Sequence, residues 1–359
     1  MNAYFQYANS QGGVNGRKIT LKVLDDAYNP SQTATDTRQL VLQDQVFALI
    51  GALGTPTHTA VLDFIKSNKV PDLFVASGSR SWNQPSTYPD TFGWQPDYTK
   101  EGKILGAYVK DNFAGKKVCS FGQNDDFGTD GVQGVEKTLG SPLASKQTYD
   151  PTNTNVGPQV GALQSAGCEV VVSFTVPGFT ALEMGTAAQL NFHPQFVVSN
   201  VGSDLVTLQG FLKTATGPLT EGMVTDTYIP IPQDSSNSWI QLFQKVNQQY
   251  NNNAPFDGNV EYGMAQAYTF LQVLKAAGKN LTRGGLVAAV EKGGYSGPGI
   301  VPLVYSKTDH SGYSGVQVAV VKNGVPTLTG QPLTTDDGSG PLKPYTTTQP
   351  SAPSDGLPQ

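Results

Sequence analysis

Apolar and polar positions follow one another along the chain in blocks that predict strands alternating with helices. Residues 46–50 form a short, continuous apolar run, as expected of a strand that is buried on both faces of a sheet. Residues 238–250 instead place apolar side chains at helical spacing, with Trp239, Phe243 and Val246 on one face. This alternation predicts an α/β fold in which helices cover parallel sheets.

The same patterns give a set of predicted elements for the whole chain. The predicted strands are residues 19–25, 46–50, 73–76, 118–121, 169–174 and 196–199. The predicted helices are residues 3–10, 31–43, 55–68, 101–113, 131–139, 156–166, 179–190, 238–250 and 262–277, with another that begins after Thr282. A hairpin is expected at 316–329, because Asn323-Gly324 suits a type I′ turn.

Two extended segments, 92–96 and 223–229, divide the chain into lobes. The predicted first lobe consists of residues 1–94 and 230–304, and the second of 95–229 and 305–330. From about Gln331 onward, Pro, Thr, Ser, Gly and Asp dominate and large apolar residues nearly vanish. Such a segment buries too little surface to offset its ordering entropy, so residues 331–359 are predicted to be disordered.

Composition and charge exclude some classes of protein. The net charge is −5 and the basic residues are scattered, so nothing resembles the basic stripe of a nucleic-acid-binding protein. No apolar run approaches the roughly 20 residues that span a bilayer. The two cysteines, Cys119 and Cys168, lie on neighbouring predicted strands about three residues out of step. That offset, roughly 10 Å, favours free thiols over a disulfide.

Six short motifs, in order and at consistent spacing, resemble one known family. They are residues 4–17, 25–26, 51–57, 71–79, 91–96 and 123–128. Together they resemble the branched-chain amino-acid (Leu/Ile/Val-binding) type of periplasmic binding protein, over residues 3 to about 325. The resemblance implies a type I periplasmic-binding-protein fold, in which three crossovers join two Rossmann-like lobes that close by a hinge motion over a ligand in their cleft.

The resemblance also implies a function. It indicates an extracytoplasmic solute-binding component of an ABC importer, which delivers a small polar ligand to a membrane permease driven by a separate ATPase. We expect a monomer with no cofactor, located in the periplasm or at the cell surface. A receptor ectodomain of the same fold, which captures ligand in order to signal, is the alternative.

The start of the chain departs from the family. Family members begin with a strand and a loop of small residues, whereas Met1 would align inside their first helix. The first strand therefore appears to be missing from this chain, and we expect an upstream strand and export signal in the natural polypeptide. Without that strand, the hydrogen-bonding groups of its neighbours would lack partners.

Strand ends supply the candidate site, because ligands of open α/β sheets bind beyond the carboxyl ends of the strands. Gly54-Thr55 begins a predicted helix, whose free amides suit an anion, and Ser77-Gly78-Ser79 follows the next strand. The alternative is that Thr55 only caps its helix and the serines only turn the chain. The predicted ligand-binding residues are Gly54, Thr55, Ala76, Ser77, Gly78, Ser79, Phe127, Val176, Asn200 and Tyr262.

The remaining candidate residues, from both lobes, carry alternatives of their own. Family members place an aromatic residue where Phe127 stands, although it can also pack against its own helix. Tyr262 either walls the pocket or belongs to the core. Amino-acid-binding relatives carry an acid near Asn200 that pairs the ligand's ammonium, and its loss disfavours zwitterionic ligands. A small organic acid, an aromatic acid or an amide suits the neutral site equally well. Arg80, beside the serines, is expected to form a salt bridge.

The sequence gives little support for an enzymatic function. The three histidines, His58, His193 and His310, are far apart and lack the spacing of metal ligands. No G-x-S-x-G elbow, P-loop or dinucleotide fingerprint occurs. The acid pairs at residues 25–26 and 125–126 are more typical of turn caps than of catalysis. The chain is therefore expected to bind without catalysing.

Overall fold

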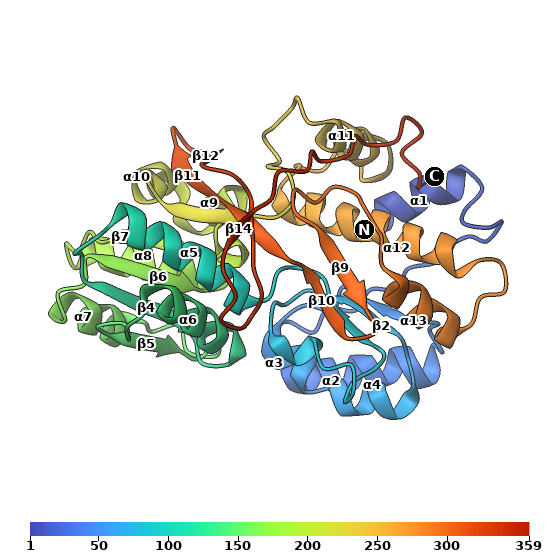
Figure 1. The fold of residues 1–359 in the computed structure, drawn as a ribbon, viewed down its shortest axis with the longest axis horizontal. Coiled ribbons are helices and arrows are strands. Elements are labelled where there is room, and N and C mark those ends of the chain that lie inside the picture. The colour runs from blue at the N-terminus through green and yellow to red at the C-terminus, as the bar shows by residue number, and fades with distance from the viewer. Residues whose placement is uncertain (359) are drawn as a thin grey trace. The chain divides into compact units, whose positions relative to one another are not determined.

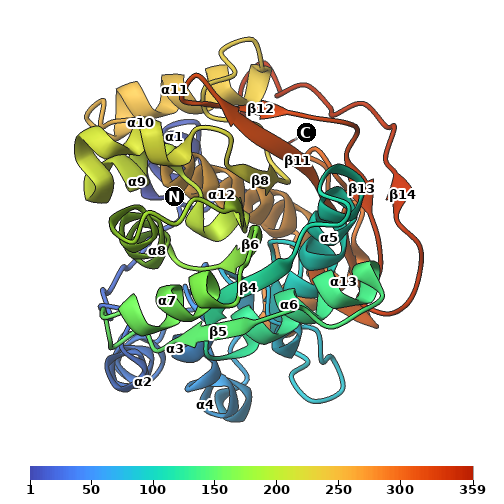
Figure 2. The same cartoon turned by 90° about the vertical axis from the view of Figure 1, so that its left-hand side faces the viewer.

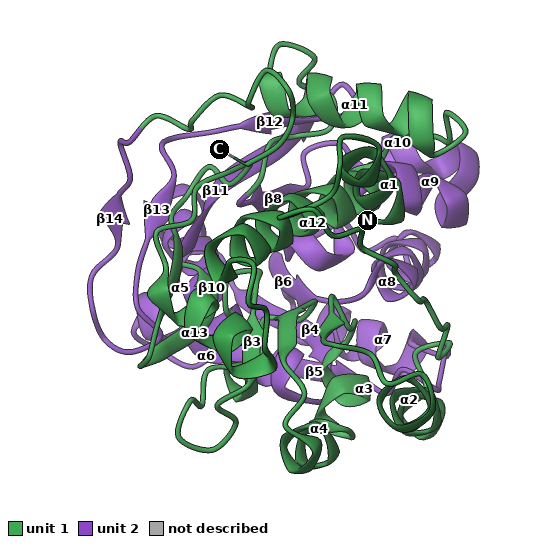
Figure 3. Cartoon of the chain, turned by 90° about the vertical axis from the view of Figure 1, so that its right-hand side faces the viewer, with its two compact units in different colours: residues 1–97, 229–314, 348–359 green, residues 98–228, 315–347 purple. Residues whose placement is uncertain are grey.

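The computed structural model describes residues 1–358, and the chain divides into two compact units (Figure 3). Unit 1 comprises Met1–Asp97, Ile229–Ser314 and the residues from Thr348 onward. Unit 2 comprises Tyr98–Tyr228 and Gly315–Thr347. The chain thus passes between the units four times, three times near the predicted crossovers and once more through the C-terminal segment.

Unit 1 contains a small parallel sheet with strand order β1-β2-β3. Its strands are β1 (Leu49–Ile50), β2 (Asp72–Val75) and β3 (Thr91–Gly93), and a hairpin adds β9 (Leu303–Ser306) and β10 (Asp309–Tyr313). Its helices are α1 (Asn2–Ser10), α2 (Pro30–Arg38), α3 (Thr55–Thr59), α4 (Leu62–Asn68), α11 (Ser238–Tyr250), α12 (Gly258–Ala277) and α13 (Arg283–Lys292). A short π-helix, Gln39–Gln43, continues α2. The sequence analysis did not predict the β9-β10 hairpin. The third boundary between the units lies at residue 314, and not at the predicted residue 304.

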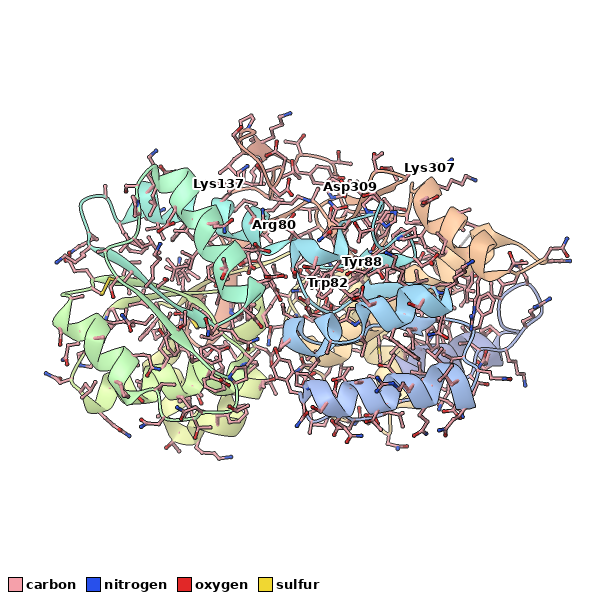
Figure 4. The ribbon with its side chains drawn as sticks, turned by 90° about the horizontal axis from the view of Figure 1, so that it is seen from below. Arg80, Trp82, Tyr88, Lys137, Lys307 and Asp309 are labelled. Atoms are coloured by element: carbon pink, nitrogen blue, oxygen red, sulfur yellow. A yellow bond between two sulfur atoms is a disulfide. The ribbon has the colours of Figure 1, made fainter. Side chains whose placement is uncertain are left out.

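Aromatic contacts hold the helices of unit 1 together. Tyr4 of α1 lies edge-on to Phe243 of α11 at 5.7 Å between ring centroids, and Trp239 meets Tyr268 of α12 at 4.7 Å. All four rings are buried, as the helical spacing predicted for Trp239 and Phe243. In the connection from β2 to β3, which Figure 4 marks with Arg80, Trp82 and Tyr88, Trp82 is buried in a cluster with residues of α4 and β2.

The strand predicted at residues 19–25 is wrong. The segment has the alternating apolar pattern of a strand, but it is irregular in the structure and its backbone joins no sheet. Ile19 forms a pair of hydrogen bonds with the side chain of Asn9, and the side chain of Lys22 pairs with Asp44. A strand requires a neighbouring backbone as well as the right pattern, and here that neighbour is absent among the described residues.

Unit 2 contains a nine-stranded sheet, in the order β14-β13-β11-β8-β7-β6-β4-β5 with β12 beside β11 (Figure 2). Its strands are β4 (Val118–Gln123), β5 (Lys146–Tyr149), β6 (Val170–Phe174), β7 (Gln195–Val198), β8 (Val224–Thr227), β11 (Gly315–Lys322), β12 (Val325–Leu328), β13 (Leu333–Thr334) and β14 (Lys343–Pro344). The helices are α5 (Tyr98–Asn112), α6 (Asp126–Leu139), α7 (Gly157–Ser165), α8 (Pro177–Gln189), α9 (Leu205–Leu212) and α10 (Thr216–Thr220). Strands β4 to β8 are parallel, and the hairpin predicted at 316–329 is confirmed as β11-β12.

The two cysteines form a disulfide, so the prediction of free thiols is wrong. Cys119 lies in β4 opposite Val171, and Cys168 precedes β6 by two residues. The prediction treated Cys168 as part of an extended strand. In the structure it follows Gly167, which has a left-handed backbone at the end of α7, and the turn brings the two Cα atoms to 5.8 Å.

The C-terminal segment, predicted to be disordered, has defined contacts along its described length (Figure 1). Strands β13 and β14 extend the sheet of unit 2. Farther along, Tyr4 Oη donates to the carbonyl of Gly356 at 2.6 Å, and Trp239 Nε1 donates to Pro350 at 2.7 Å, both within unit 1. Tyr4 and Trp239 thus help to order its last residues through polar contacts, which composition does not reveal.

Candidate functional site

A chain of hydroxyl groups lies at the carboxyl ends of β1 and β2 in unit 1. Thr55 Oγ1 and Ser77 Oγ are 2.7 Å apart, and Ser77 Oγ accepts the amide of Ser79 at 3.3 Å. All three residues are buried. Adjacent parallel strands end at the same sheet edge, which explains why residues 22 positions apart in the sequence meet.

Thr55 does not cap its helix, which was the alternative to a role in ligand binding. The cap position belongs to Gly54, whose φ of 104° is left-handed and whose added Cβ would lie 2.5 Å from Thr57 Oγ1. Thr55 is the first residue of α3, so its hydroxyl is released to pair with Ser77. Ser79 accepts the amide of Ser81, which makes it the cap of a short 3₁₀ helix. We call Gly54, Thr55 and residues 76–79 the hydroxyl rim.

Tyr262 stands at the start of α12, in the same unit as the hydroxyl rim. Its ring is half-buried and meets Trp94 edge-on at 4.8 Å, while its hydroxyl donates to Gln95 Oε1 at 3.3 Å. One turn later, Gln266 donates to the carbonyl of Phe74 in β2 at 2.8 Å. Tyr262 is therefore attached to the carboxyl-end side of the sheet and is not a member of the closed core.

Unit 2 carries an aromatic cluster at the carboxyl ends of β4, β5 and β6. Phe127 is 1% exposed and packs against Tyr98 of α5, with ring centroids 4.4 Å apart. The amide of Val176 donates to Tyr149 Oη at 3.1 Å, and Tyr149 Oη donates to Gln123 Oε1 at 3.2 Å. We call these residues the aromatic rim. It contains two of the predicted residues, Phe127 and Val176.

Asn200 lies in a buried acidic network of unit 2. Its side-chain amide donates to Glu101 Oε1 at 2.7 Å and to Asp226 Oδ1 at 3.0 Å, and its backbone amide donates to the same Glu101 oxygen at 2.9 Å. Burial raises the pKa of Glu101, against the lowering effect of its hydrogen bonds. Burial, and then the nearby charge of Glu101, raise the pKa of Asp226 well above its usual value. Both carboxyls are therefore harder to ionise than free acids, and Asn200 bridges them.

The sequence matches the family described as periplasmic binding protein over residues 1–326. The chain belongs to the periplasmic binding protein family. A Leu/Ile/Val-binding protein homologue from Brucella abortus is 26% identical over 299 residues, which are 80% of this chain and 75% of the relative.

Solved structures of periplasmic binding proteins share the fold. A branched-chain amino acid ABC transporter protein from Thermus thermophilus superposes with a TM-score of 0.79 at 19% identity, covering 93% of this chain and 90% of that one. A solute-binding protein of an ABC transporter from R. palustris gives a TM-score of 0.75 at 20% identity, covering 96% and 92%. The predicted α/β fold of the type I periplasmic binding proteins is thereby confirmed.

Sequence reasoning missed four residues of the aromatic rim and the acidic network of this periplasmic binding protein. They are Gln123, Tyr149, Glu101 and Asp226. Tyr149 ends β5, a strand whose polar sequence Lys-Gln-Thr-Tyr resembles a loop. One signal could have indicated this strand end. Tyr149 is followed by Asp150 at a position where the α/β alternation requires a strand of the second unit to end.

A large cavity of unit 1 lies apart from the hydroxyl rim. It has a volume of about 1010 Å³ and is lined by residues 17–26 and 46–53, but by none of Thr55, Ser77 or Ser79. Size alone would make it the default ligand site. Apolar side chains such as Leu21 and Ile65 line it together with polar ones such as Thr37 and Asp44. Among residues 1–358, no cluster of acidic, His or Cys side chains is suited to a metal ion, and no helix has the length and apolarity to cross a membrane.

Proposed function

We propose that this periplasmic binding protein is the solute-binding component of an ABC importer and captures a small ligand through a carboxylate or amide group. The observation that supports the proposal is the buried hydroxyl pair of Thr55 and Ser77 at the strand ends. Two hydroxyls and the neighbouring amides supply donors for an anionic or amide head group. The proposal assigns further ligand contacts to Tyr262 and to the aromatic rim, whose stacked rings Tyr149 and Phe179 offer apolar surface.

The relatives support a head group of this kind. The Thermus thermophilus protein holds valine, and the R. palustris protein is in complex with benzoate. Valine and benzoate differ in size, shape and net charge, but each carries one carboxylate. A site that recognises the carboxylate and tolerates different apolar bodies suits both.

The acidic network favours acids and amides over zwitterions. Glu101 and Asp226 lie beside Asn200, where the resemblance placed an acid for a ligand's ammonium, but Asn200 already bridges their oxygens. Because burial raises the pKa of both acids, the pair is harder to ionise than an exposed carboxylate and offers less negative charge to an ammonium. We therefore place small and aromatic organic acids and amides ahead of branched-chain amino acids.

The protein is proposed to act outside the cytoplasm as a monomer and to release its ligand unchanged to a permease with a separate ATPase subunit. Ligand recovered after incubation should be chemically identical to ligand added, which proton NMR measures directly. Conversion of any bound compound would replace the transport role with an enzymatic one.

A thermal-shift panel of branched-chain amino acids, benzoate, small organic acids and their amides tests the site. A ligand bound only by the folded state raises the melting temperature. The Thr55→Val variant, which keeps the shape and removes the hydroxyl, should then weaken binding about 10- to 100-fold, since a hydrogen bond to a charged group contributes about 1.5–3 kcal/mol. Isothermal titration calorimetry measures the loss.

Thr59→Val is the matched control, because Thr59 is exposed in the same helix and its hydroxyl bonds only the carbonyl of Thr55. Its affinity should stay within about twofold of the wild type. Equal affinity of the Thr55→Val variant and the wild type would remove the hydroxyl rim from the ligand site. Tight binding of leucine or valine, with weak binding of acids and amides, would contradict the preference drawn from Asn200.

A further inference from the structure

One face of unit 1 presents four side-chain hydrogen-bond donors to residues 349–358 of the same unit. The donors, which we call the docking face, are Tyr4 and Tyr7 of α1, Trp239 of α11 and Lys275 of α12. Each reaches a backbone carbonyl of the segment: in the same order, those of Gly356 at 2.6 Å, Asp355, Pro350 at 2.7 Å and Pro358 at 2.9 Å. Figure 1 shows the segment, in red, running past α11 to α1. The docking face thus holds the segment by its main chain.

The sequence of the segment explains why its carbonyls are free to accept hydrogen bonds. Residues 345–353 form no helix or strand, and the prolines at 350, 353 and 358 have no amide hydrogen to donate. Extended chain of this kind leaves most of its carbonyls unpaired within itself. The amide of Ala352 donates to Ser238 Oγ at 2.9 Å, at the start of α11. Aromatic surfaces that bind extended, proline-rich chain are a recurring mode of peptide recognition.

The rings of the docking face are held in place by the core of unit 1. Tyr7 lies edge-on to Tyr4 at 5.9 Å and to Tyr250 at 5.8 Å between ring centroids. Tyr4 and Trp239 are buried among the aromatic contacts of α1, α11 and α12. When the segment leaves, these rings keep their positions and water accepts the hydrogen bonds of their polar tips. The docking face is therefore a preformed surface.

The segment itself adds little to the core. Within residues 349–358, Gly356 is the one buried residue, and Leu357 is half-buried. Gly356 is also the point of closest approach: its φ is 65°, and an added Cβ would lie 2.7 Å from Leu242 Cδ1 and 3.0 Å from Tyr7 Cε1. The hydrogen bonds replace bonds with water, so the net contribution of each to stability is small. The segment is therefore held like a bound peptide and not like a packed element.

We propose that the docking face is a binding site for extended, proline-rich chain, and that residues 349–358 occupy it reversibly as a latch. The occupant is the chain's own segment, because residues 345–348 connect it to β14 and a tethered ligand has a high effective concentration. Since β14 belongs to unit 2, the latch closes the fourth passage of the chain between the units, and opening it leaves three. This role is independent of ligand capture at the hydroxyl rim.

Gly356→Val in the full chain opens the latch, since a branched side chain there meets Leu242 and Tyr7. Hydrogen exchange of residues 349–357 should become faster by about tenfold or more, while the melting temperature stays within about 4 °C of the wild type. Ser351→Val is the control, because Ser351 is exposed in the same segment, and it should leave the exchange unchanged. Unchanged exchange in the Gly356→Val variant, or a larger fall in melting temperature, overturns the latch.

A labelled synthetic peptide of residues 348–359 tests the docking face directly. It should bind the Gly356→Val chain, whose docking face is open, more tightly than the wild type by about tenfold or more, because the wild-type segment competes with it. Fluorescence anisotropy measures both affinities. The same peptide carrying Gly356→Val should not bind either chain. Equal binding of the unchanged peptide to both chains, or binding to neither, overturns the docking face.

Tyr7→Phe, added to the Gly356→Val chain, tests whether the docking face recognises carbonyls. It keeps the ring and removes the hydroxyl that donates to Asp355, so the peptide should bind about 2- to 10-fold more weakly. Tyr250→Phe is the matched control, because the hydroxyl of Tyr250 donates to Ser10 Oγ at 2.9 Å, and it should not change the affinity. Equal losses in the two variants would contradict recognition of the carbonyls.

Native mass spectrometry of the wild type tests the other occupant. A monomer supports a latch that closes within one chain. A dimer that dissociates on the Gly356→Val substitution would overturn it and assign the docking face to the segment of a second copy.

Discussion

The two α/β units differ in how completely the strands of their central sheets are paired. In unit 2, strands β4, β6, β7 and β8 each have neighbours on both sides, and the inner strands are buried. In unit 1, the sheet consists of three short strands, and β1 lines the large cavity. The comparison teaches that an apolar, alternating sequence does not make a strand by itself. Residues 19–25 have that pattern and remain irregular because no backbone lies beside them.

The largest expected difference between the units lies in core truncation. Phe121 of β4 is fully buried and packs on Tyr149, so Phe121→Ala should cost about 3–5 kcal/mol in the unfolding free energy of unit 2. Phe47 lines the large cavity and is 37% exposed, so Phe47→Ala should cost less than about 1 kcal/mol in unit 1. Hydrogen exchange in urea, read from peptides of each unit, measures the two separately. Similar costs at both positions would show that unit 1 is packed as tightly as unit 2.

A buried acid in α8 gives unit 2 a pH-dependent stability. Glu183 of α8 accepts a hydrogen bond from Ser173, and burial nevertheless raises its pKa to about 8. The folded state thus holds a proton that the unfolded state releases near pH 4.5. Stability is therefore full below about pH 4.5 and falls as the pH rises to about 8, by a few kcal/mol at most.

Glu183→Gln mimics the protonated acid and should flatten this profile. The variant should match the wild type at pH 4.5 and exceed it at pH 8, as measured by urea unfolding at each pH. Glu169→Gln is the control, since Glu169 is exposed and its hydrogen bond with Lys116 lowers its pKa instead. Parallel profiles for wild type and the Glu183→Gln variant would show that the acid is ionised in the folded state.

Much of the fold follows from the sequence because the spacing of apolar residues in a helix shows which of its faces is buried. The spacing of Trp239, Phe243 and Val246 predicts α11, and a Thr282 side chain that accepts the amide of Gly285 begins α13 as expected. In a strand, the sequence pattern gives only part of this information. Their pattern shows which face is apolar, but pairing depends on a distant segment, which is why residues 19–25 were assigned wrongly.

Some residues of the candidate site could likewise be predicted from the sequence, and others could not. Thr55 and Ser77 were placed together because the carboxyl ends of neighbouring strands must meet at one edge. Glu101 and Asp226 were not predicted to lie together. Glu101 is an acid in the first turn of a helix, where acids are normally solvated, and nothing in the local sequence shows that Asn200 bridges the two acids. The role of the predicted ligand-binding residues, Asn200 included, remains a prediction that the binding experiments test.

The smallest expected effect concerns the C-terminal segment, whose composition indicated disorder. The ammonium of Lys103, in α5, is almost fully buried and donates to the carbonyls of Asp336, Gly338 and Gly340 at 2.8–3.2 Å. It also pairs with Asp336 Oδ1 at 3.1 Å, and this hydrogen bond lowers the pKa of Asp336. One buried cation thus orders a loop that has almost no apolar side chains of its own. The exposed Lys137 (Figure 4) adds a hydrogen bond to the carbonyl of Asp337 in the same loop.

Lys103→Met keeps the length of the side chain and removes its charge. The loop should then detach while the sheet of unit 2 stays folded, with hydrogen exchange of residues 333–344 at least tenfold faster and a loss of about 1–2 kcal/mol in stability. Lys110→Met is the control, because Lys110 is exposed in the same helix and reaches one carbonyl, that of Thr138, at 3.5 Å. It should change stability by less than about 0.5 kcal/mol. An unchanged exchange rate in the Lys103→Met variant would mean that strand pairing of β13, and not the buried cation, holds the segment.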